Sequence, residues 1–286
     1  MKDPKNLLET TLNLQEIAPN EFEAPSHNPG WNRIYGGQII SQAMLAGSLT
    51  VEEDKLCHSV HAYFMRPGNP EQSVLYKVNP IRNGRSFATR TIDAFQGEEA
   101  ILTMSASYHK DEPGFDHSDK MGNIEDPESL PPFKDVLEQY GDKIPLPVRT
   151  YFEKERPFEL RPTNVERYLN PKPETPEQSF WVRALYPFNE RPTLQQAALA
   201  YASDFTLLDT ALKAHGKLLF DPKIMVASLD HAIWFHRPFN INNWLLYKQS
   251  SSNANGARSL CQGQFFDQNG TLIASTAQEG LTRPIK

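Results

Sequence analysis

The carboxylate of Asp204 is the first group in the sequence that could do chemistry. With Ser203 it stands directly before the run 205–212, whose apolar residues share one helical face, so it occupies the position of a helix N-cap. Capping is a common use of aspartate, and a carboxylate is also the group that takes a proton from water in general base catalysis. The local pattern leaves both roles open.

Two more polar side chains lie on predicted strands in the same half of the chain. Gln278 ends an alternating run that begins at Leu272 and keeps to one face, and Ser228 lies on the predicted strand 225–235. An amide at such a place often marks the strand emerging into solvent, and a hydroxyl often bonds a neighbouring backbone group. Neither residue indicates a site by itself.

Other catalytic devices are missing from the sequence. The string Gly84-Arg85-Ser86-Phe87-Ala88 lacks the last glycine of a nucleophile elbow and lies between strands. No phosphate-binding glycine loop and no C-x-x-C pair occur, and the histidines do not form a complete metal-ligand cluster. Cys57 and His58 are neighbours on a predicted strand and should point to opposite faces. We therefore predict no metal and no cofactor.

The composition narrows the class of protein. The net charge is −6, which argues against a nucleic-acid partner. Two cysteines are too few for a disulfide framework and fit a reducing compartment. Because no apolar window is long enough for a membrane span and the start of the chain lacks a signal-peptide pattern, we expect a cytoplasmic protein without a membrane span.

The two flanks of the chain resemble each other. His61-Ala62 recurs 170 residues later as His231-Ala232, and Arg66-Pro67 recurs 171 residues later as Arg237-Pro238. Further matches fall in the same order at offsets up to 173, so the pattern predicts a duplicated unit. The chain of 286 residues is then long because one unit of about 120 residues appears twice.

Both copies have the same order of predicted elements, a helix followed by four strands. Gly36-Gly37 precedes the first helix, around 40–47, and the second helix covers 205–212. The strands are expected at 59–65, 73–78, 87–95 and 101–109, then at 225–235, 244–250, 260–266 and 271–282, with earlier strands near 14–17 and 180–185. A sheet with one apolar face needs a cover, and the helix is available for it.

Eleven of the 23 prolines fall between Pro113 and Pro176, and this part of the chain reads as an ordered crossing segment. The domains predicted from these patterns are an N-terminal domain at 1–115, a connecting segment at 116–155 and a C-terminal domain at 156–286.

Five motifs together resemble the acyl-CoA thioesterase II family over nearly the whole chain. They are Tyr35-Gly36-Gly37-Gln38, the run His58 to Gly68, Ala200-Tyr201-Ala202-Ser203-Asp204, the run Asp230 to Phe239, and the run Ala274 to Gly280. The resemblance implies an α+β double hot-dog fold, in which each half wraps an antiparallel sheet around a long helix. It also implies hydrolysis of fatty acyl-CoA to a free fatty acid and CoA.

The family's catalytic aspartate, hydroxyl residue and glutamine correspond to Asp204, Ser228 and Gln278. Many bacterial members carry threonine where this chain has Ser228, and serine keeps the hydroxyl with less restriction at χ1. The first copy has no evident counterpart of these three residues, so we expect one active site in each chain.

The resemblance also suggests where the substrate acyl-CoA binds. Gly36 and Gly37 would let the backbone approach it closely, and His58 would line the site. Arg85 and Arg258, each followed by serine after a glycine turn, could meet the CoA phosphates or be ordinary surface arginines. Family members associate, so we expect a homodimer or homotetramer.

Two other functions remain open at this stage. One is a hot-dog enoyl-CoA hydratase, although the residue five positions after Asp204 is Asp209 and not the histidine of the usual hydratase motif. The other is a non-catalytic sensor that binds acyl-CoA.

Overall fold

The computed structural model describes residues 7–27, 32–219 and 221–285. The chain forms two compact units, each built from three separate segments of the sequence. Unit 1 contains Met1–Ser118, Phe188–Phe205 and Asp230–Asn240, and unit 2 contains Asp119–Pro187, Thr206–Leu229 and Ile241–Lys286. Asp204 and Ser228 therefore each lie within two residues of a point where the backbone passes from one unit into the other.

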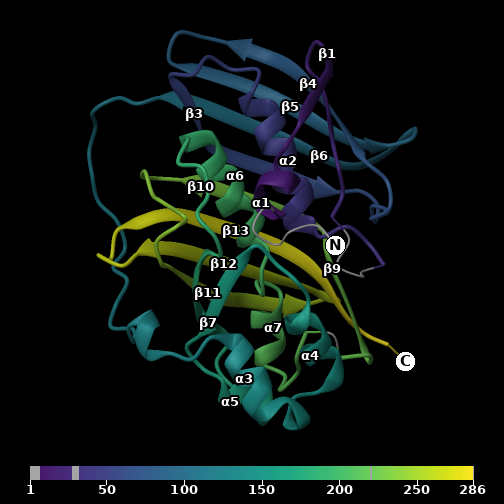
Figure 1. The fold of residues 1–286 in the computed structure, drawn as a ribbon, viewed down its shortest axis with the longest axis vertical. Helices are drawn as coiled ribbons and strands as arrows, with labels where there is room; N and C mark the ends of the chain where they lie inside the picture. Colours follow the sequence, from purple (N-terminus) through teal and green to yellow (C-terminus); the bar gives the residue numbers. More distant parts are fainter. Residues whose placement is uncertain (1–6, 28–31, 220, 286) are drawn as a thin grey trace. The chain divides into compact units, whose positions relative to one another are not determined.

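Unit 1 is built on an antiparallel sheet, drawn mainly as the purple and blue arrows of Figure 1. Its strands, in order across the sheet, are β1 (Gln15–Ala18), β2 (Glu21–Ala24), β4 (Val74–Asn83), β5 (Phe87–Gln96), β6 (Glu99–Lys110), β3 (Lys55–Phe64) and β10 (Asp230–Phe235). Buried side chains alternate with less buried ones along β5, where Ala88, Arg90, Ile92 and Ala94 point inward.

Three helices accompany this sheet: α1 (Leu7–Thr11), α2 (Gly36–Ser48) and α6 (Pro192–Ser203). Helix α2 packs on strands β2 to β6 and also against α6. It is therefore buried on most sides, which suits its nearly continuous apolar and small residues. Helix α6 starts with proline at its first turn and continues as an alanine-rich run, both of which favour a helix.

The duplicated segments meet in this sheet. Strands β3 and β10 pair so that His231 lies opposite Ala62 and Ala232 lies opposite His61. These are the two copies of the same His-Ala pair, and each histidine faces the alanine of the other copy. Reciprocal pairing of this kind is what a twofold relation between two copies produces, so the register supports an internal duplication.

Unit 2 has its own antiparallel sheet. Its strands, in order, are β9 (Ile224–Ser228), β13 (Leu272–Pro284), β12 (Arg258–Asp267), β11 (Leu245–Asn255), β8 (Glu177–Ala184) and β7 (Phe158–Pro162). The unit also contains α3 (Phe133–Tyr140), α4 (Leu146–Glu153), α5 (Glu166–Leu169) and α7 (Asp209–Lys213), with short 3₁₀ turns at Pro127–Ser129 and Gly141–Lys143.

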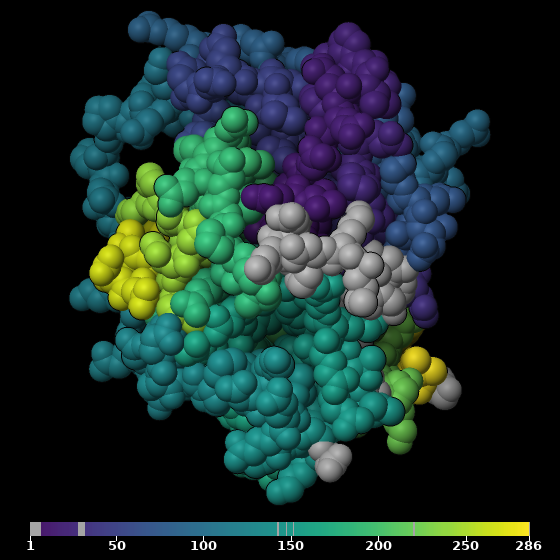
Figure 2. All heavy atoms as spheres, in the orientation of Figure 1, coloured from purple at the N-terminus to yellow at the C-terminus, as the bar shows by residue number. Residues whose placement is uncertain are grey.

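The proline-rich segment is ordered, as predicted, and it covers both faces of this sheet. Phe180 of β8 packs with Phe133, Val136, Ile144 and Val148 from α3, α4 and the turn between them. The next residue, Trp181, points to the other face and packs with Leu130, while Met121 and Ile124 lie against the same cluster. Part of this segment forms the teal surface in Figure 2.

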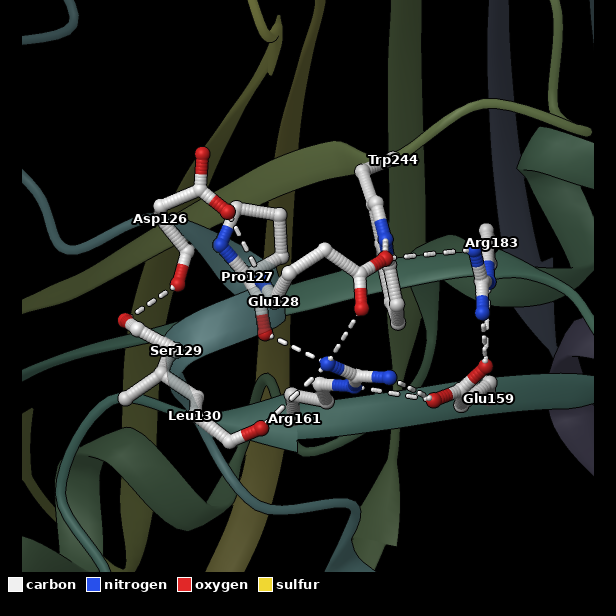
Figure 3. Close-up of polar contacts among 9 residues, drawn as sticks. All are labelled: Asp126, Pro127, Glu128, Ser129, Leu130, Glu159, Arg161, Arg183 and Trp244. Atoms are coloured by element: carbon white, nitrogen blue, oxygen red, sulfur yellow. Dashed lines mark hydrogen bonds and ion pairs between the residues drawn. The ribbon is translucent and has the colours of Figure 1, made fainter.

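A polar network fastens the start of the segment to the sheet (Figure 3). Arg161 of β7 is buried and donates to the carbonyl of Pro127 at 2.6 Å and to Glu128 at 3.0 Å. Glu128 also accepts the Trp244 indole N–H at 2.7 Å, and this hydrogen bond together with the charge of Arg161 lowers the pKa of Glu128. Arg161 is also paired with Glu159 at 2.8 Å, so its charge is compensated where it is buried.

Most predicted strands are confirmed, with bounds that differ by a few residues. The expected strand 225–235 is two strands, because the chain leaves β9 at Leu229 and enters β10 in the other unit. The prediction that Leu272 shares a face with Gln278 is wrong. A bulge between β12 and β13 turns Leu272 to the opposite face, where it packs with Trp181 and Phe266.

Candidate active site

Asp204 lies at the C-terminal end of a helix and not at the start of one. Helix α6 ends at Ser203, and Asp204 is its C-cap residue with φ −87° and ψ −2°. The predicted helix 205–212 is wrong in its first half. Only its second half is helical, in the short α7 (Asp209–Lys213). Thr206 has a φ of 59°, which interrupts the helical path between the two. The N-cap interpretation of Asp204 is therefore excluded.

The surroundings of Asp204 are almost entirely buried. Every residue from Gln195 to Ser203 and from Phe205 to Lys213 is buried, and Asp204 between them is partly exposed. Asp204 is therefore the residue of this stretch that solvent can reach, whereas the other aspartate, Asp209, is buried.

The carboxylate of Asp204 meets the start of α2. Its Oδ2 atom accepts the backbone N–H of Gly37 at 3.0 Å. The start of a helix carries a partial positive charge and unpaired N–H groups, and both favour a nearby anion. Gly36 and Gly37 belong to the first turn of α2 itself, whereas the sequence analysis placed them before a helix expected around 40–47.

Both glycines are required by this close approach. A Cβ atom on Gly36 would lie 2.7 Å from Asp204 Oδ2, and one on Gly37 would lie 2.3 Å from the carbonyl oxygen of Tyr201. The two helices therefore touch backbone to backbone at this point. The close approach predicted for these glycines is found toward α6; their predicted contact with substrate stays a prediction.

Aromatic rings hold the residues on either side of Asp204. Tyr35, the N-cap residue of α2, donates from its hydroxyl to the carbonyl of Tyr201 at 3.1 Å. Its ring stacks on Phe205 with centroids 5.3 Å apart and tilts against Tyr201 at 5.0 Å. The sequence analysis did not assign these contacts, although Tyr35 and Tyr201 both lie in the motifs that carry the family resemblance.

Ser203, the residue before Asp204, is hydrogen-bonded to a buried histidine. Its hydroxyl donates to the carbonyl of Ala200 at 2.8 Å, so the 2.9 Å contact with His231 must have the Nε2–H of His231 as the donor. His231 is neutral there, because complete burial lowers its pKa to about 3. Its Nδ1 atom has no hydrogen-bond partner within the described residues.

The burial of His231 should make folding stability depend on pH. The pKa is about 3 in the folded state and about 6.5 in the unfolded state, so the unfolded chain binds the extra proton first. Stability is therefore full above pH 6.5 and falls toward pH 3, by about 1.4 kcal/mol per pH unit once the unfolded histidine is charged. Denaturant unfolding at pH 7 and pH 5 should show a smaller loss in His231→Gln than in the wild type.

The control for that measurement is His215→Gln, because His215 is exposed. This variant should keep the wild-type difference between the two pH values. An equal pH slope in His231→Gln and the wild type would contradict the assignment of a neutral buried histidine.

Ser228 and Gln278 lie close together in unit 2. Ser228 of β9 is directly opposite Gly280 of β13, and Gln278 is two residues from Gly280 on the same strand. The two side chains therefore project from the same face as diagonal neighbours, with Cα atoms about 7–8 Å apart. Gln278 is fully buried and Ser228 is partly exposed.

The same face receives the chain that follows Asp204. Leu208, four residues after Asp204, packs on Gly280 so closely that a Cβ there would lie 2.4 Å from Leu208 Cδ1. This glycine therefore keeps the β13 backbone next to the segment after Asp204.

The other predicted residues have ordinary partners in the structure. His58 occupies a bulge of β3, and its Nε2 lies 2.8 Å from the Ser107 hydroxyl. Arg85 is exposed in the turn between β4 and β5, and Arg258 pairs with Glu279 at 3.1 Å. Whether His58 lines the substrate site and the two arginines bind phosphate stays a prediction.

Cys57 does not act with His58. Burial raises the pKa of the Cys57 thiol to about 12, and its sulfur contacts the backbone carbonyl of Ser59. Such a thiol is not ionised at neutral pH and is a poor nucleophile. Within the described residues, no group of three or more potential ligands could hold a metal ion, and no helix is long and apolar enough to cross a membrane.

Known proteins resemble this chain over its whole length. A model of the acyl-CoA thioesterase family matches residues 147–281, and a model of the acyl-CoA thioesterase N-terminal domain matches residues 24–109. Acyl-CoA thioesterase 2 of Haemophilus influenzae is 38% identical, with 99% of both chains covered. The chain belongs to the acyl-CoA thioesterase family. It hydrolyses acyl-CoA thioesters, which confirms the reaction predicted from the resemblance.

Solved structures agree with this assignment. The acyl-CoA thioesterase II TesB2 of Mycobacterium marinum is 34% identical, with a TM-score of 0.79 and 97% of both chains covered. A protein of Alicyclobacillus acidocaldarius with a hot-dog fold has the same TM-score at 16% identity and 98% coverage of both chains. The α+β double hot-dog fold predicted for this thioesterase is thus confirmed.

Proposed function

We propose that this thioesterase hydrolyses fatty acyl-CoA with a water molecule held by Asp204, Ser228 and Gln278. Asp204 takes a proton from the water, whose oxygen attacks the thioester carbonyl carbon. Ser228 and Gln278 orient the water by hydrogen bonds. The C–S bond then breaks, the proton passes to the CoA sulfur, and the fatty acid leaves. No covalent acyl-enzyme is needed in this sequence of steps.

One observation carries the proposal. Asp204 is a partly exposed carboxylate in an otherwise buried stretch, and its Oδ2 is fixed by the Gly37 N–H at the start of α2. A base fixed through one oxygen keeps a defined direction toward a water molecule, which is the main requirement of this chemistry. The diagonal pair of Ser228 and Gln278 supports it by presenting a hydroxyl and an amide from one face of β9 and β13.

The same helix start supplies a candidate for the oxyanion. The N–H group of Gly37 is bonded to Asp204, and those of Gln38 and Ile39 are bonded to the carbonyl of Tyr35. Among the N–H groups of this first turn, we assign the contact with the thioester oxyanion to Gly36.

His58, Arg85 and Arg258 would contact the CoA portion, and the enzyme would work in the cytoplasm as a homodimer or homotetramer. In this proposal the two copies of the duplicated unit are residues 1–115 and 156–286, and residues 116–155 connect them. The first copy would serve as scaffold and wall for a single active site.

Ser228 variants test the proposed water site. Ser228→Ala should lower kcat about 10- to 100-fold, because it removes one of the groups that orient the water. Ser228→Thr keeps the hydroxyl and should retain most of the activity. The measurement is release of free CoA thiol from acyl-CoA substrates of several chain lengths.

The control for these variants is Ser105→Ala, an exposed serine on β6. It should leave kcat unchanged. Full activity of Ser228→Ala would contradict the proposal.

A further inference from the structure

The residue two positions after Asp204 has a strained backbone. Thr206 has a φ of 59°, in the left-handed region. A β-branched side chain is rare there, and such a conformation costs of the order of 1–3 kcal/mol unless the surroundings impose it. Strained residues of this kind are found preferentially at functional sites. Because Thr206 lies only two residues after the proposed base, the groups that hold it in this conformation bear on the site.

The buried Gln249 and the partly buried Gln178 hold Thr206 at its side chain and its backbone. Gln178 of β8 donates from Nε2 to the Thr206 carbonyl at 3.0 Å. The Thr206 hydroxyl donates to Oε1 of Gln249 at 3.1 Å. The same Nε2 of Gln178 also donates to Gln249 Oε1 at 2.8 Å, so the glutamines are tied to each other.

The contacts define the orientation of both amides. The Thr206 carbonyl can only accept, so the Gln178 atom facing it is the nitrogen. That nitrogen also faces Gln249, whose facing atom must then be the oxygen. Gln249 Oε1 accepts a further hydrogen bond from the Thr210 hydroxyl at 3.1 Å, and Gln249 is 3% exposed. A single buried oxygen thus gathers three donors next to the strained residue.

We propose that Gln249 is a positioning residue that imposes the left-handed conformation of Thr206 and thereby sets the direction of Asp204. The inference rests on the proposed function of Asp204 as the base. The turn from Ser203 to Thr206 is held at its start by Tyr35, which bonds Tyr201 and stacks on Phe205. Gln249 and Gln178 hold its end. Along the chain, Asp204 follows the first anchor and comes two peptide bonds before Thr206.

The strain makes the role of Gln249 testable. Threonine needs external hydrogen bonds to stay in the left-handed region, whereas glycine adopts it without steric cost. Gln249→Leu removes the oxygen and keeps a similar volume. In the wild-type background it should lower kcat roughly tenfold with less than about a twofold change in KM, because the base is misdirected while substrate binding is kept. In the Thr206→Gly background the same substitution should lower kcat less than about threefold.

Thr210→Val is the matched control, because it removes a donor to the same oxygen without touching the turn. It should leave kcat within about twofold of the wild type. Thermal unfolding of every variant separates loss of activity from loss of fold. If Gln249→Leu does not fold, the comparison of Thr206→Val with Thr206→Gly replaces it. Valine keeps the strain and loses the hydroxyl, so it should be the less active of the two.

Equal fold-losses from Gln249→Leu in the two backgrounds would overturn the positioning role, as would a Thr206→Val that is more active than Thr206→Gly. These outcomes are distinct from failure of the proposed function, which is decided by whether Asp204 itself is required for turnover.

Discussion

Replacing Asp204 with asparagine should lower kcat about 10²- to 10⁴-fold, which corresponds to about 3–5 kcal/mol of activation free energy. Asparagine keeps an oxygen that can accept the Gly37 N–H, so the contact at the start of α2 survives. What it lacks is the basicity to take a proton from water. The fold should therefore stay intact and KM should change little. Thiol release under saturating acyl-CoA measures kcat, and thermal unfolding checks the fold.

Asp93→Asn is the matched control for this variant. Asp93, on strand β5 of unit 1, is partly buried and accepts a hydrogen bond from the Thr103 hydroxyl at 2.6 Å. It therefore resembles Asp204, which is also partly buried and also accepts a hydrogen bond. Its replacement should leave kcat unchanged. Wild-type turnover by Asp204→Asn would remove Asp204 from the mechanism, and the roles assigned to Ser228 and Gln278 would then lose their base.

Alternation of side chains was the reliable signal for the sheets. Apart from Arg90, strands β5 and β6 have small or apolar residues at every second position, and a tight turn at Gln96-Gly97 joins them, so their places follow from the sequence. The bulge that turns Leu272 to the other face could not be found this way. One inserted residue leaves the composition of a strand unchanged and reverses the face of everything before it.

The helix that carries Asp204 was the main element missed. The apolar residues 205–212 have helical spacing, yet the chain there turns at Thr206, because Gln178 and Gln249 provide hydrogen bonds from distant strands. A signal for the true helix was present in Pro192 followed by an alanine-rich run. Long-range contacts of this kind override local periodicity, and they also decide the site. The bonds from Gly37 to Asp204 and from His231 to Ser203 join residues far apart in the chain.

The glycine pair at the start of α2 should respond to alanine in two different ways. In Gly37→Ala, the new Cβ would lie 2.3 Å from the backbone oxygen of Tyr201, and neither helix backbone can yield at that distance without separating. We expect a loss of about 3 kcal/mol in unfolding free energy, measured by denaturant unfolding. In Gly36→Ala, the nearest atoms are Asp204 Oδ2 at 2.7 Å and Phe64 Cζ at 3.0 Å, which are ends of side chains.

Those side-chain ends can rotate away, so Gly36→Ala should lose little stability but move the carboxylate of Asp204. A displacement of about 1 Å at a catalytic base costs up to about 10²-fold in rate, and kcat of Gly36→Ala should fall by roughly that factor. Gly114→Ala is the control for both variants, because no atom of the described residues lies within 4 Å of its added Cβ. A Gly36→Ala enzyme with normal kcat would show that turnover tolerates a shifted Asp204. The close packing of α2 on α6 would then serve the fold alone.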